Sequence, residues 1–161
     1  CPRLTHVLPL SMALIRGSGL NSLTTLEIVW CGDLRAVFPL DTDAQSYQDH
    51  RRNQAITVEF PSLQRIHLHE SPKLHGLCGR GRMYAPKLES MVIRGCWNLT
   101  RIPSVGDGGD RITKKVKCDC EKEWWDRLEW DGLEERHHPS LYEPTHPKYY
   151  KKTMLRTSVL R

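Results

Sequence analysis

One spacing of apolar residues recurs along the chain and constrains its fold more than any other feature. Each copy has a leucine, isoleucine or methionine at its first, fourth and sixth positions, a cysteine or serine at its ninth and a leucine at its twelfth. The copies begin at Leu23, Leu63 and Leu88, and none contains a gap. This spacing predicts one short strand and one turn, repeated along the chain so that neighbouring copies share a core.

Within each copy, apolar residues alternate with variable ones, as they do in a strand that is buried on one face. The apolar members, such as Leu26 and Ile28, should point into the core, and the residues between them should point outward. Outward residues do not hold the fold together, so they are the candidates for contact with a partner. In the three copies these candidates are Glu27, Val29, Arg65, His67, His69, Ser90, Val92 and Arg94.

A weaker fourth copy and an aromatic segment follow. Residues 112–120 (ITKKVKCDC) predict a further strand, with Val116 and Cys118 inward and Lys115 and Lys117 outward. Large apolar side chains at helical spacing then predict a short amphipathic helix over residues 121–131, which would cover the end of the array. These side chains are Trp124, Trp125, Leu128 and Trp130.

The pattern is that of leucine-rich repeats and predicts an α/β fold. The expected architecture is a short leucine-rich repeat solenoid with parallel strands on the concave face, loops and short helices on the convex side, and a Trp-rich C-terminal cap. We expect a repeat domain over residues 1–132 and a basic tail with prolines and histidines over residues 133–161. Inside the domain we expect a partial repeat (1–20), repeats at 21–60, 61–85 and 86–110, and a terminal strand with the cap (111–132).

The first repeat interval is longer than the second, and the extra residues 41–53 are polar, so they predict a loop. Two prolines, Pro61 and Pro86, precede two of the repeat strands, and we expect them at the first, unpaired positions of those strands. Cys1, Leu4 and Val7 match only the second half of a repeat, without an initiator methionine or signal peptide. We therefore expect the chain to be a C-terminal fragment without a membrane span.

Charge and cysteines narrow the classes of function. The net charge of +5 comes from the last residues, because residues 1–143 carry equal numbers of acidic and basic side chains. The outward basic residues are interrupted by Glu27 and Asp119, and this interruption argues against nucleic acid as the partner. Cys31 and Cys96 occupy the same repeat position, which favours a buried structural role over disulfides and indicates a reducing, intracellular location in the cytoplasm or the nucleus.

Catalysis, cofactors and metals find little support. Cys118 and Cys120 form a CxC pair with histidines at 137, 138 and 146 downstream, but the spacing is not one of the usual zinc-ligand pairs, and we expect these histidines in an exposed tail. His67 and His69 lie on an outward strand face without a nucleophile motif near them. We therefore expect no enzyme, no cofactor and no metal.

Three segments carry a specific resemblance: LTTLEIVWCGDLRAVF, FPSLQRIHLHESPKLHGL and APKLESMVIRGCWNLTRIP, followed by EKEWWDRLEWDG. They resemble the C-terminal leucine-rich repeats of plant intracellular nucleotide-binding disease-resistance proteins, in particular those of cereals. The resemblance implies that the matching leucines are scaffold. It also implies that the outward residues recognise a pathogen effector or host protein, or hold the receptor inactive through contact with its nucleotide-binding domain.

The resulting hypothesis is a protein-interaction module of a plant immune receptor. Its outward candidates include Lys115 and Lys117 in addition to the residues of the three copies. The alternative is a leucine-rich repeat substrate adaptor or scaffold outside immunity, because such repeats serve many interaction roles. A phosphate-binding loop upstream of Cys1 would favour the receptor, and an F-box would favour the adaptor.

Overall fold

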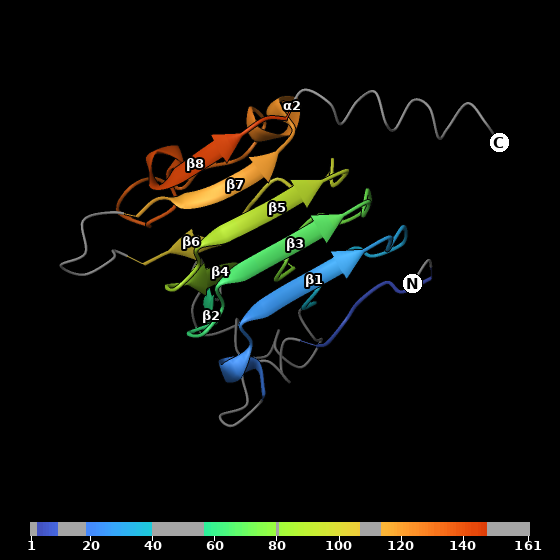
Figure 1. The fold of residues 1–161 in the computed structure, drawn as a ribbon. Coiled ribbons are helices and arrows are strands. Elements are labelled where there is room, and N and C mark those ends of the chain that lie inside the picture. The colour runs from blue at the N-terminus through green and yellow to red at the C-terminus, as the bar shows by residue number, and fades with distance from the viewer. Residues whose placement is uncertain (1–2, 10–18, 40–56, 80, 107–113, 148–161) are drawn as a thin grey trace.

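The computed structural model describes residues 3–9, 19–39, 57–79, 81–106 and 114–147. Its main element is a five-stranded sheet in which all neighbouring strands are parallel (Figure 1). This regular stacking is the solenoid that the repeated spacing predicts. In order across the sheet, the strands are β1 (Thr25–Val29), β3 (Arg65–His69), β5 (Ser90–Arg94), β7 (Val116–Cys120) and β8 (Tyr142–Thr145).

The register of the sheet puts equivalent repeat positions side by side. Leu26 pairs with Ile66 and Ile28 pairs with Leu68, and the same rows continue into β5 and β7. The alternation predicted from the sequence is confirmed, because every inward residue of these rows is buried and contributes about 1.5–3 kcal/mol for each Leu or Ile. The rows are Leu26, Ile66, Met91 and Cys118, and Ile28, Leu68, Ile93 and Cys120.

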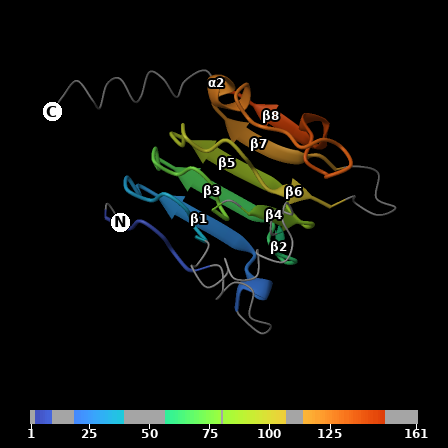
Figure 2. The same cartoon turned by 180° about the vertical axis from the view of Figure 1, so that it is seen from behind.

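A second parallel sheet of three short strands lies beside the beginnings of the first sheet's strands (Figures 1 and 2). Its strands are β2 (Thr57–Glu59), β4 (Arg82–Ala85) and β6 (Ser104–Val105). This sheet stands on the side where the sequence analysis expected loops and short helices. Pro61 and Pro86 lie in the turns that lead from β2 to β3 and from β4 to β5, and not at the first positions of β3 and β5 as we expected.

The core fills the space between the two sheets. Val58, Met83 and Ala85 point inward from the second sheet and belong to the same buried cluster as the first sheet's leucines. The Phe38 and Phe60 rings pack against each other at a centroid distance of 5.2 Å, tilted by 35°. Backbone hydrogen bonds outside the strands extend the stacking, since Phe60 N–H donates to the carbonyl of Tyr84 at 2.8 Å.

The turn after each repeat strand has a conserved geometry within this chain. The residues that follow β1, β3 and β5 are Trp30, Glu70 and Gly95, and all have left-handed backbone angles, with φ of 58°, 51° and 65°. The ninth repeat position comes next, and Cys31, Ser71 and Cys96 are buried there as expected. The Cys96 thiol donates to the carbonyl of Arg94 at 3.5 Å, which links the turn to the end of the strand.

The C-terminal cap differs from the predicted helix. Only residues Lys122–Trp125 form a helix (α2), because the chain then leaves the helix and Glu129 N–H donates to the carbonyl of Thr100 at 2.9 Å. Trp124 is buried and its indole N–H donates to the carbonyl of Leu99 at 2.8 Å, so this residue does cover the end of the repeats.

Residues after the cap helix continue the fold. A short 3-10 helix (η3, Pro139–Leu141) leads into β8, which pairs with β7 and adds a fifth strand that the sequence analysis did not predict. Tyr142 is buried, and its hydroxyl donates to the carbonyl of Pro103 at 2.5 Å. The expectation that these histidines lie in an exposed tail is therefore wrong for His137, which is only 3% exposed. The other short helix, η1 (Gly19–Ser22), precedes β1.

Two sequence predictions cannot be compared with the structure. The polar loop at 41–53 lies outside the described residues, and so do residues 148–161 of the basic tail. The repeat boundaries also stay a prediction.

Among the described residues, no helix is both long enough and apolar enough to cross a bilayer, and the five described cysteines are all free thiols.

Candidate functional site

The outward residues of β1, β3, β5, β7 and β8 form one surface, which we call the open face. Strand register arranges them in rows that run across the sheet. All predicted outward residues of β1, β3 and β5 lie on it, and Lys117 lies on it from β7. Lys115 is exposed but precedes β7, so it is outside the paired rows. The rows are Thr25, Arg65, Ser90, Lys117 and Glu143; Glu27, His67, Val92, Asp119 and Thr145; and Val29, His69 and Arg94.

The charges of the open face are less positive than the sequence analysis expected. Arg94 is only 15% exposed in its side chain and pairs with Asp119 at 2.5 Å, so it adds no net charge to the surface. His67 Nδ1 lies 3.5 Å from the Glu27 carboxylate. Arg65 and Lys117 are exposed and have no ion-pair partner among the residues that the structure describes. These two cations therefore dominate the part of the open face where the strands begin.

The other end of the open face is aromatic. Trp30 follows β1 and is 63% exposed, which is unusual for so large an apolar side chain. Its ring meets the His69 ring edge-on at a centroid distance of 5.6 Å, and His69 meets His67 at 6.3 Å. Since Trp30 N–H donates to the carbonyl of His69 at 2.9 Å, the backbone that carries the indole is fixed to the sheet.

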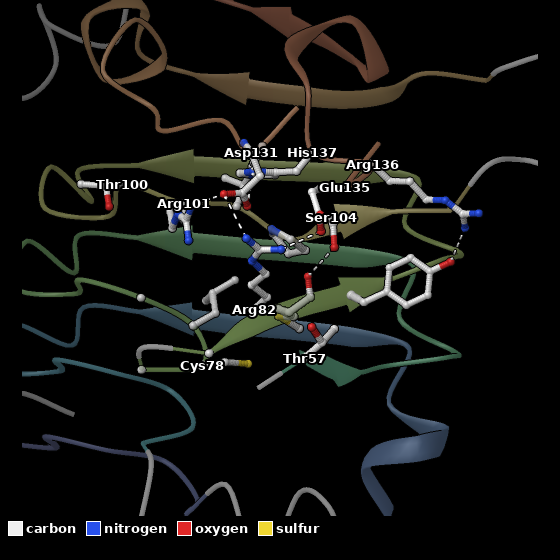
Figure 3. Close-up of a pocket in the computed structure, with 18 of the residues that line it drawn as sticks. Thr57, Cys78, Arg82, Thr100, Arg101, Ser104, Asp131, Glu135, Arg136 and His137 are labelled. Carbon is white, nitrogen blue, oxygen red and sulfur yellow. Dashed lines mark hydrogen bonds and ion pairs between the residues drawn. The ribbon is translucent and has the colours of Figure 1, made fainter. Parts of the chain in front are cut away.

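A separate cavity of about 490 Å³ lies on the outer side of the second sheet. Its floor includes the outward residues of this sheet, Thr57, Arg82 and Ser104, and its wall is the segment 131–137 (Figure 3). This cavity was not predicted from the sequence. No sequence signal indicates it, because β4, the Arg101 turn and the segment 131–137 come together only in the folded chain.

Several charged side chains that line this cavity are paired with one another. Arg82 pairs with Glu135 at 2.6 Å and with Asp131 at 3.5 Å, and Arg101 also pairs with Asp131 (Figure 3). Asp131 further approaches His137, whose Nδ1 lies 3.2 Å from the carboxylate. Burial lowers the pKa of His137 and outweighs the opposite influence of Asp131, so the imidazole is neutral at neutral pH. The cluster thus joins the cap to the repeats.

The cysteine and histidine pattern does not assemble into a metal site in the described residues. Cys118 and Cys120 both point into the core, and only His146 approaches them, with Nδ1 at 3.9 Å from the Cys120 sulfur. His137 lies in the ion-pair cluster of the cavity instead. Within the described part of the chain, no three metal-binding side chains converge.

The buried thiols are unreactive because burial disfavours the charged thiolate. Burial raises the pKa of Cys78 to about 12 and that of Cys96 to about 11. A thiol is a nucleophile only as the thiolate, so these side chains behave as small apolar core residues.

Comparison with known proteins agrees with this architecture. A family model described as "Plant disease resistance protein RPS2-like, leucine-rich repeats" matches residues 1–105. The disease resistance protein At4g27190 of Arabidopsis thaliana is 30% identical over 129 residues, which cover 71% of this chain and 13% of that protein. No solved structure matches the chain.

The chain therefore spans a small part of the length of the curated relative that it matches. The repeat spacing, the parallel sheet and the family match agree on the same class of region. They favour the disease-resistance hypothesis over the adaptor alternative, because the matched model describes resistance proteins. This chain belongs to the RPS2-like leucine-rich repeat family of plant disease resistance proteins.

Proposed function

We propose that this region is the protein-interaction module of a plant immune receptor, and that its open face recognises a pathogen effector or a host protein. The observation that carries the proposal is that the variable residues of every repeat strand lie together on one exposed surface, while the residues of the repeat pattern are buried. A rigid sheet that displays variable side chains binds by surface complementarity. The proposal assigns no catalytic step to the region.

The candidate contacts are the outward residues that we predicted from the sequence. Tyrosine, tryptophan and arginine dominate the energetics of many protein interfaces, and the open face adds Trp30 to the predicted set. The same surface is also suited to contact with the receptor's own nucleotide-binding domain, which would hold the receptor inactive inside the cell, in the cytoplasm or the nucleus. The candidate contacts predicted from the sequence are Glu27, Val29, Arg65, His67, His69, Ser90, Val92, Arg94, Lys115 and Lys117.

The test uses the full-length receptor expressed in leaf tissue together with a panel of pathogen effectors. We would replace Arg65 and Lys117 by glutamate, because both are exposed and neither stabilises the sheet through an ion pair among the described residues. Lys87→Glu is the matched control, since Lys87 is an exposed lysine in the turn before β5 and lies off the open face. The readout is cell death, with receptor accumulation measured on blots.

Two results would support the proposal. Loss of the effector-triggered response at normal accumulation supports recognition, and cell death without an effector supports the inhibitory contact. If the double variant responds like the wild type and like Lys87→Glu, the open face is not the interaction surface.

A further inference from the structure

We propose that the open face binds a protein segment that carries an acidic residue at one end and an aromatic or large aliphatic residue at the other. This inference rests on the proposed function, because it assumes that the open face is the interaction surface. It goes further by naming the chemistry of the partner. The two ends of the strands differ in the side chains that they expose.

The cationic end is formed by Arg65 and Lys117 with Ser90 between them in register. Since neighbouring strands lie about 4.8 Å apart, the two cationic strands are separated by roughly 10 Å. Ser90 is short, so the space above it stays open for a carboxylate that both long side chains can reach. Glu143 follows Lys117 in the same row, but no ion pair joins them, and it lies on the last strand of the sheet.

The aromatic end is formed by Trp30 with His69 and His67. Trp30 is 63% exposed, and the edge-on contact of its ring with the His69 ring limits the freedom of the side chain. An exposed aromatic side chain that is already held in place loses little conformational entropy when a partner covers it. Val29 is partly exposed in the row next to Trp30, so apolar area continues along the face.

The distance between the two ends sets the spacing in the partner. Arg65 and His69 are the first and last residues of β3, and four strand steps of about 3.3 Å span roughly 13 Å. An extended segment covers this distance in about four residues. We therefore expect the acidic and the apolar anchor of the partner to be three to five positions apart.

Two other interpretations of the surface are weaker on the same observations. A nucleic acid would meet the carboxylates of Glu27 and Glu143 on the open face, and these repel a phosphate backbone. The arginines of the cavity behind the second sheet are already paired with Asp131 and Glu135, so an acidic partner would have to displace those carboxylates.

The experiment is a selection with a random twelve-residue peptide library displayed on phage, on immobilised full-length receptor. Peptides that also bind the double variant Arg65→Ser, Lys117→Ser are removed first. We expect the enriched peptides to hold Asp or Glu three to five positions from Trp, Phe or Leu. A synthetic copy of the most enriched peptide is then labelled, and its affinity is measured by fluorescence anisotropy.

In this measurement the double variant and Trp30→Ser should each weaken binding at least about tenfold. Lys87→Ser and Leu133→Ser are the matched controls for charge and for exposed apolar area, because both residues are exposed and lie off the open face. The controls should bind like the wild type. Circular dichroism of each variant checks that the fold is kept.

Several results would overturn the inference. These are no enrichment at all, enrichment of basic or uncharged peptides, or equal binding by wild type and Trp30→Ser. A labelled RNA hairpin that binds the wild type but not the double variant would assign the cationic end to nucleic acid instead. Failure here is distinguishable from failure of the proposed function, since the leaf assay can still lose its response in the charge variant whatever peptides are selected.

Discussion

Ser71 occupies a repeat position that Cys31 and Cys96 fill in the neighbouring repeats, and it fits that position less well. All three residues are buried, but the Ser71 hydroxyl has no hydrogen-bond partner among the described residues, whereas the Cys31 and Cys96 thiols make weak bonds to carbonyl groups. A buried polar group without a partner destabilises a protein, and a hydroxyl loses more than a thiol does.

We predict that Ser71→Cys raises the free energy of unfolding by about 1 kcal/mol. Chemical unfolding followed by circular dichroism measures it. Ser71→Ala serves as the comparison, since it removes the hydroxyl without adding the sulfur and should give a smaller gain. A loss of stability in both variants would mean that the hydroxyl is satisfied in solution.

Gly95 takes the left-handed conformation that Trp30 and Glu70 adopt at the equivalent points of earlier repeats. A Cβ atom at Gly95 would lie 2.8 Å from a carboxylate oxygen of Glu70, and φ is +65°. Glu70 can move aside, so the backbone conformation supplies most of the cost of a side chain.

Gly95→Ala should therefore lower the free energy of unfolding by about 1 kcal/mol. The control is Gly32→Ala, because a Cβ atom there would meet nothing within 4 Å. Thermal unfolding of both variants decides the matter, and equal midpoints would contradict the prediction.

The cap is the element that differs most from its prediction. Asp131 attaches it to the repeats. Its carboxylate pairs with Arg82 from β4 and with Arg101 from the turn after β5, and its side chain is only 14% exposed. Removing this carboxylate takes away the one largely buried partner that the two arginines share, and leaves them only their more exposed partners Glu135 and Glu129.

We expect Asp131→Asn to lower the free energy of unfolding by about 1–2 kcal/mol. Glu129→Gln is the matched control: Glu129 contacts Arg101 at 3.5 Å but is 63% exposed, so its loss should matter by less than about 0.5 kcal/mol. The measurement is urea unfolding, and a similar effect of both substitutions would argue against the attachment.

His137 makes the same cap sensitive to acid. Its pKa is lowered in the folded state by burial, so the unfolded chain takes up a proton first as the pH falls below the ordinary value of 6.5. The stabilising contribution is therefore present above this pH and is lost below it. Unfolding midpoints at pH 7.5 and 5.5 should differ more in the wild type than in His137→Gln. An identical pH dependence would contradict the assignment.

At the scale of elements, β1, β3, β5 and, from its weaker copy of the spacing, β7 could be predicted, whereas β2, β4, β6 and β8 could not. β1, β3 and β5 each carry a full copy of the apolar spacing, which contains the strand, its inward face and its turn. β2, β4 and β6 have two to four residues each, too few for a period to be visible. β8 contains Pro144, which argues against a strand in sequence terms, and it is held by Tyr142 and by pairing with β7.

Across the whole molecule, each strand should be stabilised mainly by the strands that pair with it. β3 and β5 have a paired neighbour on each side, while β8 pairs with β7 alone. We expect backbone amides of β3 and β5 to exchange with deuterium more slowly than those of β8, measured by mass spectrometry on the 161-residue chain.

Leu68→Ala tests this coupling, because Leu68 is fully buried in β3, which has a paired strand on each side. Exchange should accelerate most in β1 and β5, which flank β3, and least in β8. Uniform acceleration across all strands would indicate a single cooperative unit.

The candidate site was predictable in its sidedness but not in its charges. Strand alternation is enough to place Arg65 and Arg94 on the same face of the sheet. It could not indicate that Arg94 pairs with Asp119, since that contact depends on the register between β5 and β7. Trp30 lies one position beyond the alternation, and its exposure follows from the left-handed turn that ends the strand.

The presence of strands on both sides of the core has a geometric result. Strands stack about 4.8 Å apart, whereas packed helices need about 8–10 Å, so an array with helices on one side must bend toward the other. With short strands on both sides, successive repeats advance by nearly equal steps and have little cause to bend. In such an array, gaining or losing one repeat would move the partner contacts of all later repeats by one strand step. The orientation of those contacts would stay almost unchanged.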